Sequence, residues 1–298
     1  MPELAALFKP LSYLTQPEYR VFWGYLLISL PISVWVYRRQ TRSIKPGMRF
    51  LFSKQLWLNP SVLLDFKLIF VNHAIWITLL APLLISQLTL ALSVNRELKT
   101  LLGAGDFFSP NKLTISIIYT VIIFIVDDFS RFYIHRLYHK VPWLWRFHAV
   151  HHSATLLTPF TLYRVHLVEM FINALRSILV MGVIGGLFIY LIDGRFSKLE
   201  LLGTSIFSLA FNLLGANLRH SHIWLSFGKV EQWIISPAQH QIHHSANPSH
   251  FDKNFGVMIA TWDRIFNSWI PSKNNSVSEV GLAQPIEQTL KAHCLGIK

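Results

Sequence analysis

The sequence has little cysteine and little charge. Its one cysteine, Cys294, lies near the C-terminus, which excludes an internal disulfide framework, a cysteine zinc finger and a four-cysteine iron–sulfur cluster. Charged residues make up 14% of the 298 residues, whereas they make up roughly 25% of a typical soluble domain. Such a chain has too little polar surface to cover a soluble fold. Together with a mean hydropathy of +0.39, this indicates a multi-pass membrane protein.

Acidic residues are especially scarce. The chain has 15 Asp and Glu against 27 Lys and Arg, which gives a net charge of +12 with histidine neutral. A nucleic-acid-binding protein can carry such an excess, but its hydropathy would be lower, so a face against anionic lipid headgroups is favoured. Intrinsic disorder is excluded because 22 Phe and 10 Trp residues are far too many.

Long apolar runs predict the membrane helices, since a bilayer core of about 30 Å needs about 20 helical residues. The runs are 20–37, 66–92, 113–133, 167–192 and 199–218. Pro82 predicts a kink in the second run, and the short turn 193–198 predicts a hairpin of the last two. The first run lacks the cleavage site and preceding positive charges of a signal peptide. We therefore expect an all-α, multi-pass membrane protein with about four or five transmembrane helices.

The orientation of the predicted helices follows from one basic loop. Residues 38–54 contain six Lys and Arg and no acidic residue, which places them in the cytoplasm by the positive-inside rule. Alternation then puts 93–112 outside, 134–166 inside, 193–198 outside and 219–298 inside. The histidine-rich segments are therefore expected to form a helical cap on the cytoplasmic face.

Histidine is as abundant as cysteine is rare. Of the 14 histidines, 12 lie between residues 135 and 250. Eight of them form one HxxxH and two HxxHH patterns, namely His135 and His139, then His148, His151 and His152, then His240, His243 and His244. Spacings of three and four put the histidines of each pattern on one face of a helix. A lone pair of this kind is typical of an interfacial helix end, but three patterns together predict metal binding.

Eight imidazoles are too many for a single zinc ion, which takes four ligands in structural sites and usually three in catalytic ones. They suit two metal ions that keep open positions. Imidazole binds Zn, Cu, Fe and Ni, so the ligand type leaves the metal open. Open coordination beside lipid suits a metal that activates O₂ to attack an unactivated C–H bond. The zinc-protease motif HExxH is absent, because Arg136 follows His135.

Further candidates are less tightly patterned. His166 and His220 lie beside predicted membrane helices, where each is either a metal ligand or a histidine that hydrogen-bonds among the headgroups. His222 and His250 are weaker candidates, and His73 is expected to be packed or hydrogen-bonded inside an apolar run. His293 is expected to lie in a solvated tail and to play no part.

Asp128 lies seven residues, about two helical turns, before His135. A carboxylate is costly near the end of a membrane helix unless it is paired. We expect Asp128 either to orient the free N–H of a histidine ligand or to form an ion pair with Arg131.

At these residues the sequence resembles the fatty acid hydroxylase/sterol desaturase superfamily of integral-membrane di-iron enzymes. The resemblance covers about 115–270 and rests on the three histidine patterns and on four flanking stretches. These are Asp128–Arg136, Arg164–His166, Asn217–Ser221 and Pro237–Phe266. It departs from the family at Leu167, where a proline often follows, and at His222, where the family has Asn.

The resemblance implies a protein that uses two iron ions and O₂ to hydroxylate or desaturate a lipid taken from the bilayer, such as a sterol or a fatty acyl chain. Electrons would come from a separate cytoplasmic reductase, ferredoxin or cytochrome, since the chain carries no Gly-rich dinucleotide fingerprint and no cysteine cluster. No nucleic-acid partner is expected. The alternatives are a histidine-rich metal transporter, whose ligands would lie near the bilayer midplane, and a membrane haem protein.

The expected organisation has three parts. Residues 1–112 form an N-terminal membrane region, 113–270 a di-iron catalytic domain and 271–298 a polar tail. The membrane would be the cytoplasmic membrane of a bacterium or the endoplasmic reticulum of a eukaryote.

Overall fold

The computed structural model describes residues 4–41, 49–192, 197–198, 200–201, 204–294 and 296. Arg42 and Lys45 of the basic loop, and most of the predicted turn 193–198, lie outside the described residues. The elements are α1 (Leu4–Leu7), η1 (Lys9–Leu14), α2 (Trp23–Thr41), α4 (Lys54–Trp57), α5 (Pro60–Ile75), the π-helical turn η2 (Trp76–Leu80), α6 (Ala81–Leu83), α7 (Gln87–Leu102), α8 (Lys112–Lys140), α9 (Pro142–His152), η3 (Pro159–Tyr163), α10 (Leu167–Leu191), β1 (Glu200–Leu201), β2 (Thr204–Ser205), α11 (Ile206–Leu213), η4 (Ala216–His220), η5 (Gly228–Gln232), α12 (Pro237–His243), η6 (Pro248–His250), α13 (Thr261–Ile265) and α14 (Leu290–Cys294).

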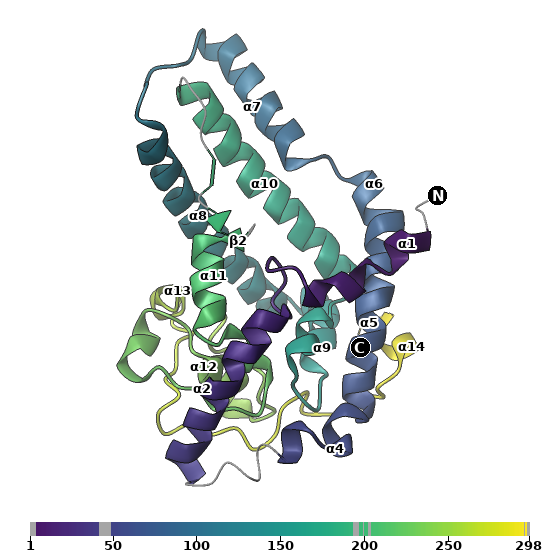
Figure 1. The fold of residues 1–298 in the computed structure, drawn as a ribbon. Coiled ribbons are helices and arrows are strands. Elements are labelled where there is room, and N and C mark those ends of the chain that lie inside the picture. The colour runs from purple at the N-terminus through teal and green to yellow at the C-terminus, as the bar shows by residue number, and fades with distance from the viewer. Residues whose placement is uncertain are drawn as a thin grey trace.

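Over the residues that the structure describes, the fold is helical, as expected, and its only strands are the two-residue β1 and β2, which pair antiparallel. It has two ends (Figure 1). At one end α7, α8 and α10 extend as long helices. At the other end α9, η3 and residues 216–294 form a compact unit, here called the cap. The division into the three predicted parts stays a prediction.

Within the described residues, three stretches are long and apolar enough to cross a membrane, namely Pro60–Leu102, Lys112–Lys140 and Leu167–Leu191. This is fewer than the four or five helices expected. The run 20–37 forms α2, but this helix carries Arg38 and Arg39 in its last turn and packs with Val36 against Leu218 and Ile223 of the cap. The run 199–218 is also too short, because α11 ends at Leu213 and Gly215 adopts a left-handed backbone conformation.

The kink predicted at Pro82 is found close by. The first stretch bends through η2 and α6 and is interrupted at Leu84–Ser86 before α7 begins. Proline removes a backbone donor and clashes with the preceding turn, so helical hydrogen bonding cannot continue regularly there.

Small residues let α7 and α10 approach closely. A Cβ atom at Gly186 would lie 2.6 Å from the carbonyl oxygen of Ala91, and one at Gly182 would lie 2.7 Å from the side chain of Leu90. Only glycine fits this contact, as is common where membrane helices pack backbone to backbone.

The long helices place the histidine segments together. In Figure 1, the stretch from α5 through α6 to α7 and the helix α10 each run from the level of the cap to the far end, and α8 returns from the far end to the cap. A bridge between Phe108 and Ile192 joins the far ends. The last turn of α8, the segment 142–166 and residues 219–294 therefore lie at the opposite end. This agrees with the relative sides derived from the charge pattern.

A buried ion pair fixes α5 to the cap. Arg164 and Asp65 are both fully buried, and Arg164 Nε donates to Asp65 Oδ1 at 2.6 Å. Arg164 Nη2 also donates to the carbonyl oxygen of Ser61 at 2.6 Å. The arginine of the Arg-x-His element is therefore a structural anchor.

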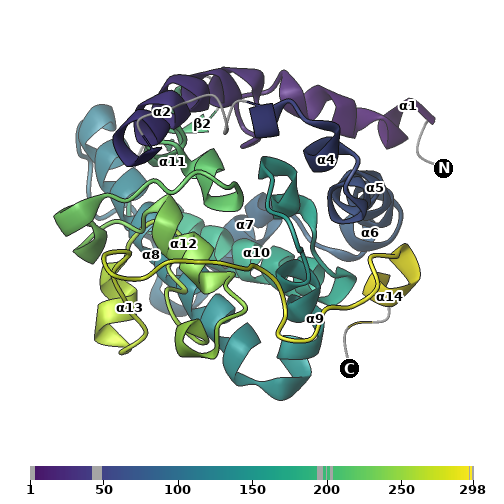
Figure 2. The same cartoon turned by 90° about the horizontal axis from the view of Figure 1, so that it is seen from below.

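The C-terminal segment is not the solvated tail expected from its polarity. It crosses the cap beneath α12 and ends in α14 beside α5 (Figure 2). Val280 bridges to Ser245, Gln288 accepts from Arg164 at 2.8 Å, and His293 is buried against Ser153 at 2.8 Å. Polar side chains on this segment serve as hydrogen-bonding partners for the cap, which is why composition alone suggested a solvated tail.

Candidate dimetal centre

The histidine patterns lie at the end of the long helix α8 and on the short helices α9 and α12. The pair His135 and His139 lies in the last turns of α8, and an extended residue, Val141, then turns the chain into α9. Pro142 begins α9, where a missing backbone donor costs nothing. The sharp turn brings the second pattern back alongside the first.

The third pattern begins at a capped helix. Ser236 and Gln239 form a capping box, and Pro237 occupies the first turn of α12. Because these capping interactions are local, α12 can begin here without a tertiary contact, and its first turn holds the following histidines in place. The pairs at positions i and i+4 share one face of the helix, and His243 faces another direction.

The structure brings nine histidines together in two groups. The first group consists of His135, His139, His148, His152 and His243, and the second of His151, His220, His240 and His244. Within each group one nitrogen of every ring lies within 4.8 Å of the others. His135 and His139 are half-buried and the rest are buried. The groups adjoin, since the ring centroids of His152 and His244 are 4.5 Å apart.

The second group has the spacing of a metal-binding set. The Nε2 atoms of His220, His240 and His244 form a triangle with sides of 3.0, 3.2 and 3.2 Å. Nitrogens about 2.1 Å from one metal ion, at tetrahedral to right angles, lie about 3.0–3.4 Å apart. These three nitrogens therefore fit a common metal ion.

In the first group, the ring nitrogens that face the centre lack a hydrogen-bond partner, whereas outward-facing nitrogens donate hydrogen bonds to backbone carbonyl groups. The Nε2 atoms of His139, His148, His152 and His243 are buried without a hydrogen-bond partner. On the outward side, His135 Nδ1 donates to the carbonyl oxygen of Phe255 at 2.8 Å, and His243 Nδ1 donates to that of Lys253 at 2.8 Å. Such bonds fix the tautomer and leave the Nε2 lone pair available, as second-layer partners of metal-bound histidines do.

Burial keeps these imidazoles neutral. It lowers the pKa of His148 to about 3 and, together with the charge of His148, that of His151 to about 4. Burial and neighbouring imidazoles also lower the pKa values of His243 and His244 well below the usual range. Neutral imidazole is the form that binds a metal, so both groups can hold a metal ion near neutral pH.

One buried carboxylate that is hydrogen-bonded to a histidine is that of Glu169, which the sequence patterns did not single out. It is buried, and its Oε2 accepts from His148 Nδ1 at 3.1 Å. It lies in the first turn of α10, just beyond the segment 135–166, which lacks acidic residues. An acidic residue that opens an apolar membrane helix must be paired, and that signal was available from the sequence.

In the described chain, Asp128 is hydrogen-bonded neither to a histidine nor to Arg131. Its oxygens accept from Met258 N at 3.0 Å, Ile259 N at 3.1 Å and Trp262 Nε1 at 3.0 Å. Arg131 instead pairs with Asp127 at 2.7 Å. Asp128 thus fixes residues 258–262. The reason is that its side chain faces two backbone N–H groups that have no other partner nearby. Residues 258–262 follow shortly after Lys253 and Phe255, whose carbonyl groups orient two histidines of the first group.

The remaining candidate histidines lie outside both groups. His166 caps α10 by accepting from Val168 N, and its other nitrogen donates to the carbonyl oxygen of Cys294 at 3.1 Å, so neither nitrogen is available to a metal. His222 packs against Phe50. His73 is hydrogen-bonded, as expected, to Tyr13 and to the carbonyl oxygen of Ala6. His250 is buried and belongs to neither group.

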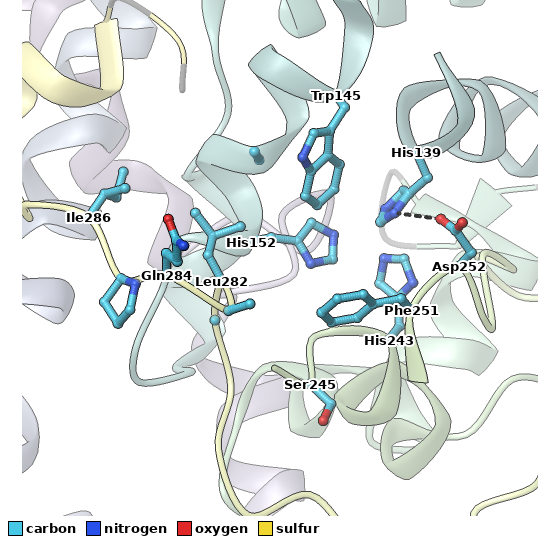
Figure 3. A pocket seen from close by; sticks show the side chains of 14 residues that line it. His139, Trp145, His152, His243, Ser245, Phe251, Asp252, Leu282, Gln284 and Ile286 are labelled. Carbon is cyan, nitrogen blue, oxygen red and sulfur yellow. Dashed lines mark ion pairs between the residues drawn. The ribbon is translucent and has the colours of Figure 1, made fainter. Parts of the chain in front are cut away.

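Cavities reach the histidines from two sides. A cavity of about 490 Å³ opens beneath the first group, between Trp145, Phe251 and the segment 281–286. In Figure 3 the rings of His139, His152 and His243 face this space. Asp252 lies beside it, with Oδ1 3.7 Å from His139 Nδ1. A second cavity, of about 250 Å³, reaches both groups from the side of the long helices.

Comparison with known proteins gives the same assignment as the motifs. The sequence model of the fatty acid hydroxylase family matches residues 120–268, half of the chain. The alkylglycerol monooxygenase of Danio rerio is 28% identical over 55% of this chain, and that of Homo sapiens is 26% identical over 55%. The ornithine lipid hydroxylase OlsE of Rhizobium tropici is 25% identical over 58% of this chain.

The matched regions cover only part of each relative's length. They cover 32% and 33% of the two alkylglycerol monooxygenases and 52% of the ornithine lipid hydroxylase. No solved structure matches the chain. The matched region contains both histidine groups and the segments that orient them. The chain is therefore a membrane protein of the fatty acid hydroxylase family.

Proposed function

We propose that this protein hydroxylates a lipid with O₂, using two metal ions held by the two histidine groups. The observation that carries the proposal is the convergence of nine buried or half-buried imidazoles on two adjacent points, with free nitrogens directed inward. When bound, a pair of iron ions would supply the O₂ activation that attack on an unactivated C–H bond requires. The balanced reaction consumes a C–H bond, O₂, two electrons and two protons, and yields an alcohol and water.

The residues of the chain would contribute binding, orientation and exclusion of water. The first group supplies up to five nitrogens and the second four, which leaves room for O₂ and substrate if not all of them bind at once. The carbonyl groups of Phe255 and Lys253 hold His135 and His243 in place. Glu169 offsets part of the positive charge beside His148. Alkylglycerol monooxygenase and ornithine lipid hydroxylase relatives favour hydroxylation of a lipid over desaturation.

Electrons would come from a separate protein that docks on the cap, which we place on the cytoplasmic side. Trp145 supports this choice. Its ring centroid lies 4.9 Å from that of His139, and the indole lines the cavity on the cap side. A carrier on that face would approach the first group without crossing the bilayer.

Metal analysis combined with lipid analysis tests the proposed function. Protein purified without O₂ should contain about two iron ions per chain, and reduction followed by O₂ should add one oxygen atom to a lipid in membranes of the host. About one metal ion or none per chain would overturn the two-metal centre. A haem absorption band would favour the haem alternative, and a lipid product two hydrogens lighter would show desaturation.

Glu169 gives a separate test of the first group. Replacing it by glutamine keeps the shape but removes the charge that His148 Nδ1 donates to. We expect metal affinity to fall about 10–100-fold, as is common when such a partner is lost. Competition with a chelator measures it, and Glu97→Gln, exposed on α7, serves as the control. Unchanged affinity in Glu169→Gln would show that the carboxylate has no influence on the metal.

A further inference from the structure

Two cavities on the membrane side of the histidines adjoin and share three lining residues. The upper cavity, of about 280 Å³, lies among α8, α10 and α11. Ile123, Phe124 and Met181 form an apolar patch in a lining that is otherwise largely polar and includes the carboxylates of Glu18, Asp127 and Asp128. The lower cavity is the one of about 250 Å³ that reaches both histidine groups. Arg20 and Val257 line both cavities, as does Arg131. Together the two cavities, here called the path, extend from between the long helices to the proposed metal centre.

Two arginines on this path lack a carboxylate partner. No hydrogen bond or ion pair joins Arg20 to any residue in the described ranges, and it is half-buried. Arg219 is only 2% exposed, and its guanidinium lies 4.7 Å from the centre of the Phe211 ring. One of its nitrogens donates to the carbonyl oxygen of Val257, while Nε is buried without a partner.

The nearby carboxylates are already engaged. Asp127 binds both Arg131 and Arg176 at 2.7 Å. Asp128 accepts three N–H groups, Glu169 binds His148, and Glu18 is exposed beside Tyr19. In the described chain, Arg20 and Arg219 therefore have no carboxylate within hydrogen-bonding distance, and among the carboxylates only the nearby charge of Asp128 favours their charged forms.

An unpaired buried charge costs several kcal/mol. The cost is offset if a ligand brings the opposite charge, and arginine is well suited to bind phosphate or carboxylate through several N–H groups. Both arginines line the lower cavity, which gives them a common space where one anion can bind.

We propose that this path binds an amphiphile with an anionic group, a phosphate or a carboxylate, held at Arg20 and Arg219 with its alkyl chain along the apolar patch of Ile123, Phe124 and Met181. The inference deepens the proposed function and rests on it for the reaction itself. The oxidised C–H bond would then lie close to the anionic group, since the arginines line the same cavity as the histidines. An uncharged sterol or alkyl chain would leave both arginines unpaired.

Equilibrium binding to the purified protein, with its metals and without O₂, tests the proposal. The probes are dodecyl phosphate, the uncharged 1-dodecylglycerol and inorganic phosphate, in micelles of a neutral detergent. We expect dodecyl phosphate to bind at least about tenfold more tightly than 1-dodecylglycerol, as loss of a charged hydrogen bond typically costs tenfold or more. Equal binding of the two amphiphiles would overturn the proposal. Inorganic phosphate that competes as well as dodecyl phosphate would overturn the lipid part of it.

Variants of Arg20 test whether this arginine causes the preference for dodecyl phosphate over 1-dodecylglycerol. Arg20→Gln should lose about tenfold in affinity for dodecyl phosphate and change that for 1-dodecylglycerol less than about twofold, because no hydrogen bond of the fold is removed. Arg20→Lys should keep most of the preference. The control is Arg96→Gln, whose side chain is 75% exposed on α7. Since partition into micelles is the same for every variant, an unchanged preference in Arg20→Gln would exclude this arginine.

The binding measurement and the test of the proposed function can give opposite results. Binding without O₂ requires no turnover, so a clear preference for dodecyl phosphate would stand even if no lipid were oxidised. Conversely, lipid hydroxylation without any preference for an anion would keep the proposed function and overturn the anionic site.

Discussion

Replacing His243 by alanine is expected to remove about one of two bound metal ions per chain and to abolish lipid hydroxylation. His243 Nε2 lies among the nitrogens of the first group, and its ring centroid is 4.6 Å from that of His135 and 4.7 Å from that of His152. The substitution removes a central member of the set, whereas the second group keeps all four of its histidines. Metal analysis and product analysis of the purified variant measure both effects.

The adjacent residue provides the matched comparison. His244→Ala should empty the second group and leave the first intact, because His244 Nε2 is one corner of the triangle with His220 and His240. The double variant should retain almost no metal. His222→Ala is the control, since this histidine packs against Phe50 outside both groups and both metal ions should remain. Full metal content in His243→Ala, or loss of metal in His222→Ala, would contradict the assignment.

Replacing Asp65 by alanine is expected to lower the free energy of unfolding by about 3–5 kcal/mol, because it leaves the fully buried Arg164 without its counter-charge. The effect should reach the proposed metal centre as well. The carbonyl oxygen of Arg164 accepts from His151 Nδ1 at 3.3 Å, so displacement of Arg164 would also disturb the second group. Denaturant unfolding in detergent micelles measures the stability, and metal analysis the second effect.

A double substitution separates the charge from the packing. Asp65→Leu combined with Arg164→Met removes both charges together, and apolar replacements of buried ion pairs are often neutral or stabilising. The double variant should therefore recover most of the loss. Arg96→Gln breaks only the exposed pair with Glu97 and should leave stability nearly unchanged. If Asp65→Ala were as stable as the unchanged protein, the buried pair would not anchor α5 to the cap.

The histidine spacing predicted much of the proposed centre because it reports local geometry. Residues four apart on a helix project to the same side, and this holds whatever the rest of the chain does. His135 and His139, His148 and His152, and His240 and His244 each stay in one group. Adjacent histidines point about 100° apart, which is why His151 and His152 belong to different groups, as do His243 and His244.

Two of the expected membrane helices, 20–37 and 199–218, are not among the candidate spans of the described chain. Apolar composition alone does not distinguish them from spans. The run that forms α2 packs with Val36 into an apolar cluster of the cap, and an apolar surface can be buried against protein as well as against lipid. The run at 199–218 is broken at Gly215, whose left-handed backbone turns the chain into η4. That turn also brings His220 to the second group.

The sequence by itself determined the helical membrane character of the chain, the extent of α10 and the pairs of histidines that share a group, because hydropathy and helical periodicity are local properties. Only the tertiary structure decided which pairs share a group, that Glu169 and not Asp128 contacts a histidine, and that Arg20 and Arg219 line one cavity. These are contacts between residues up to about two hundred positions apart, and they depend on how whole helices pack, which no local pattern encodes.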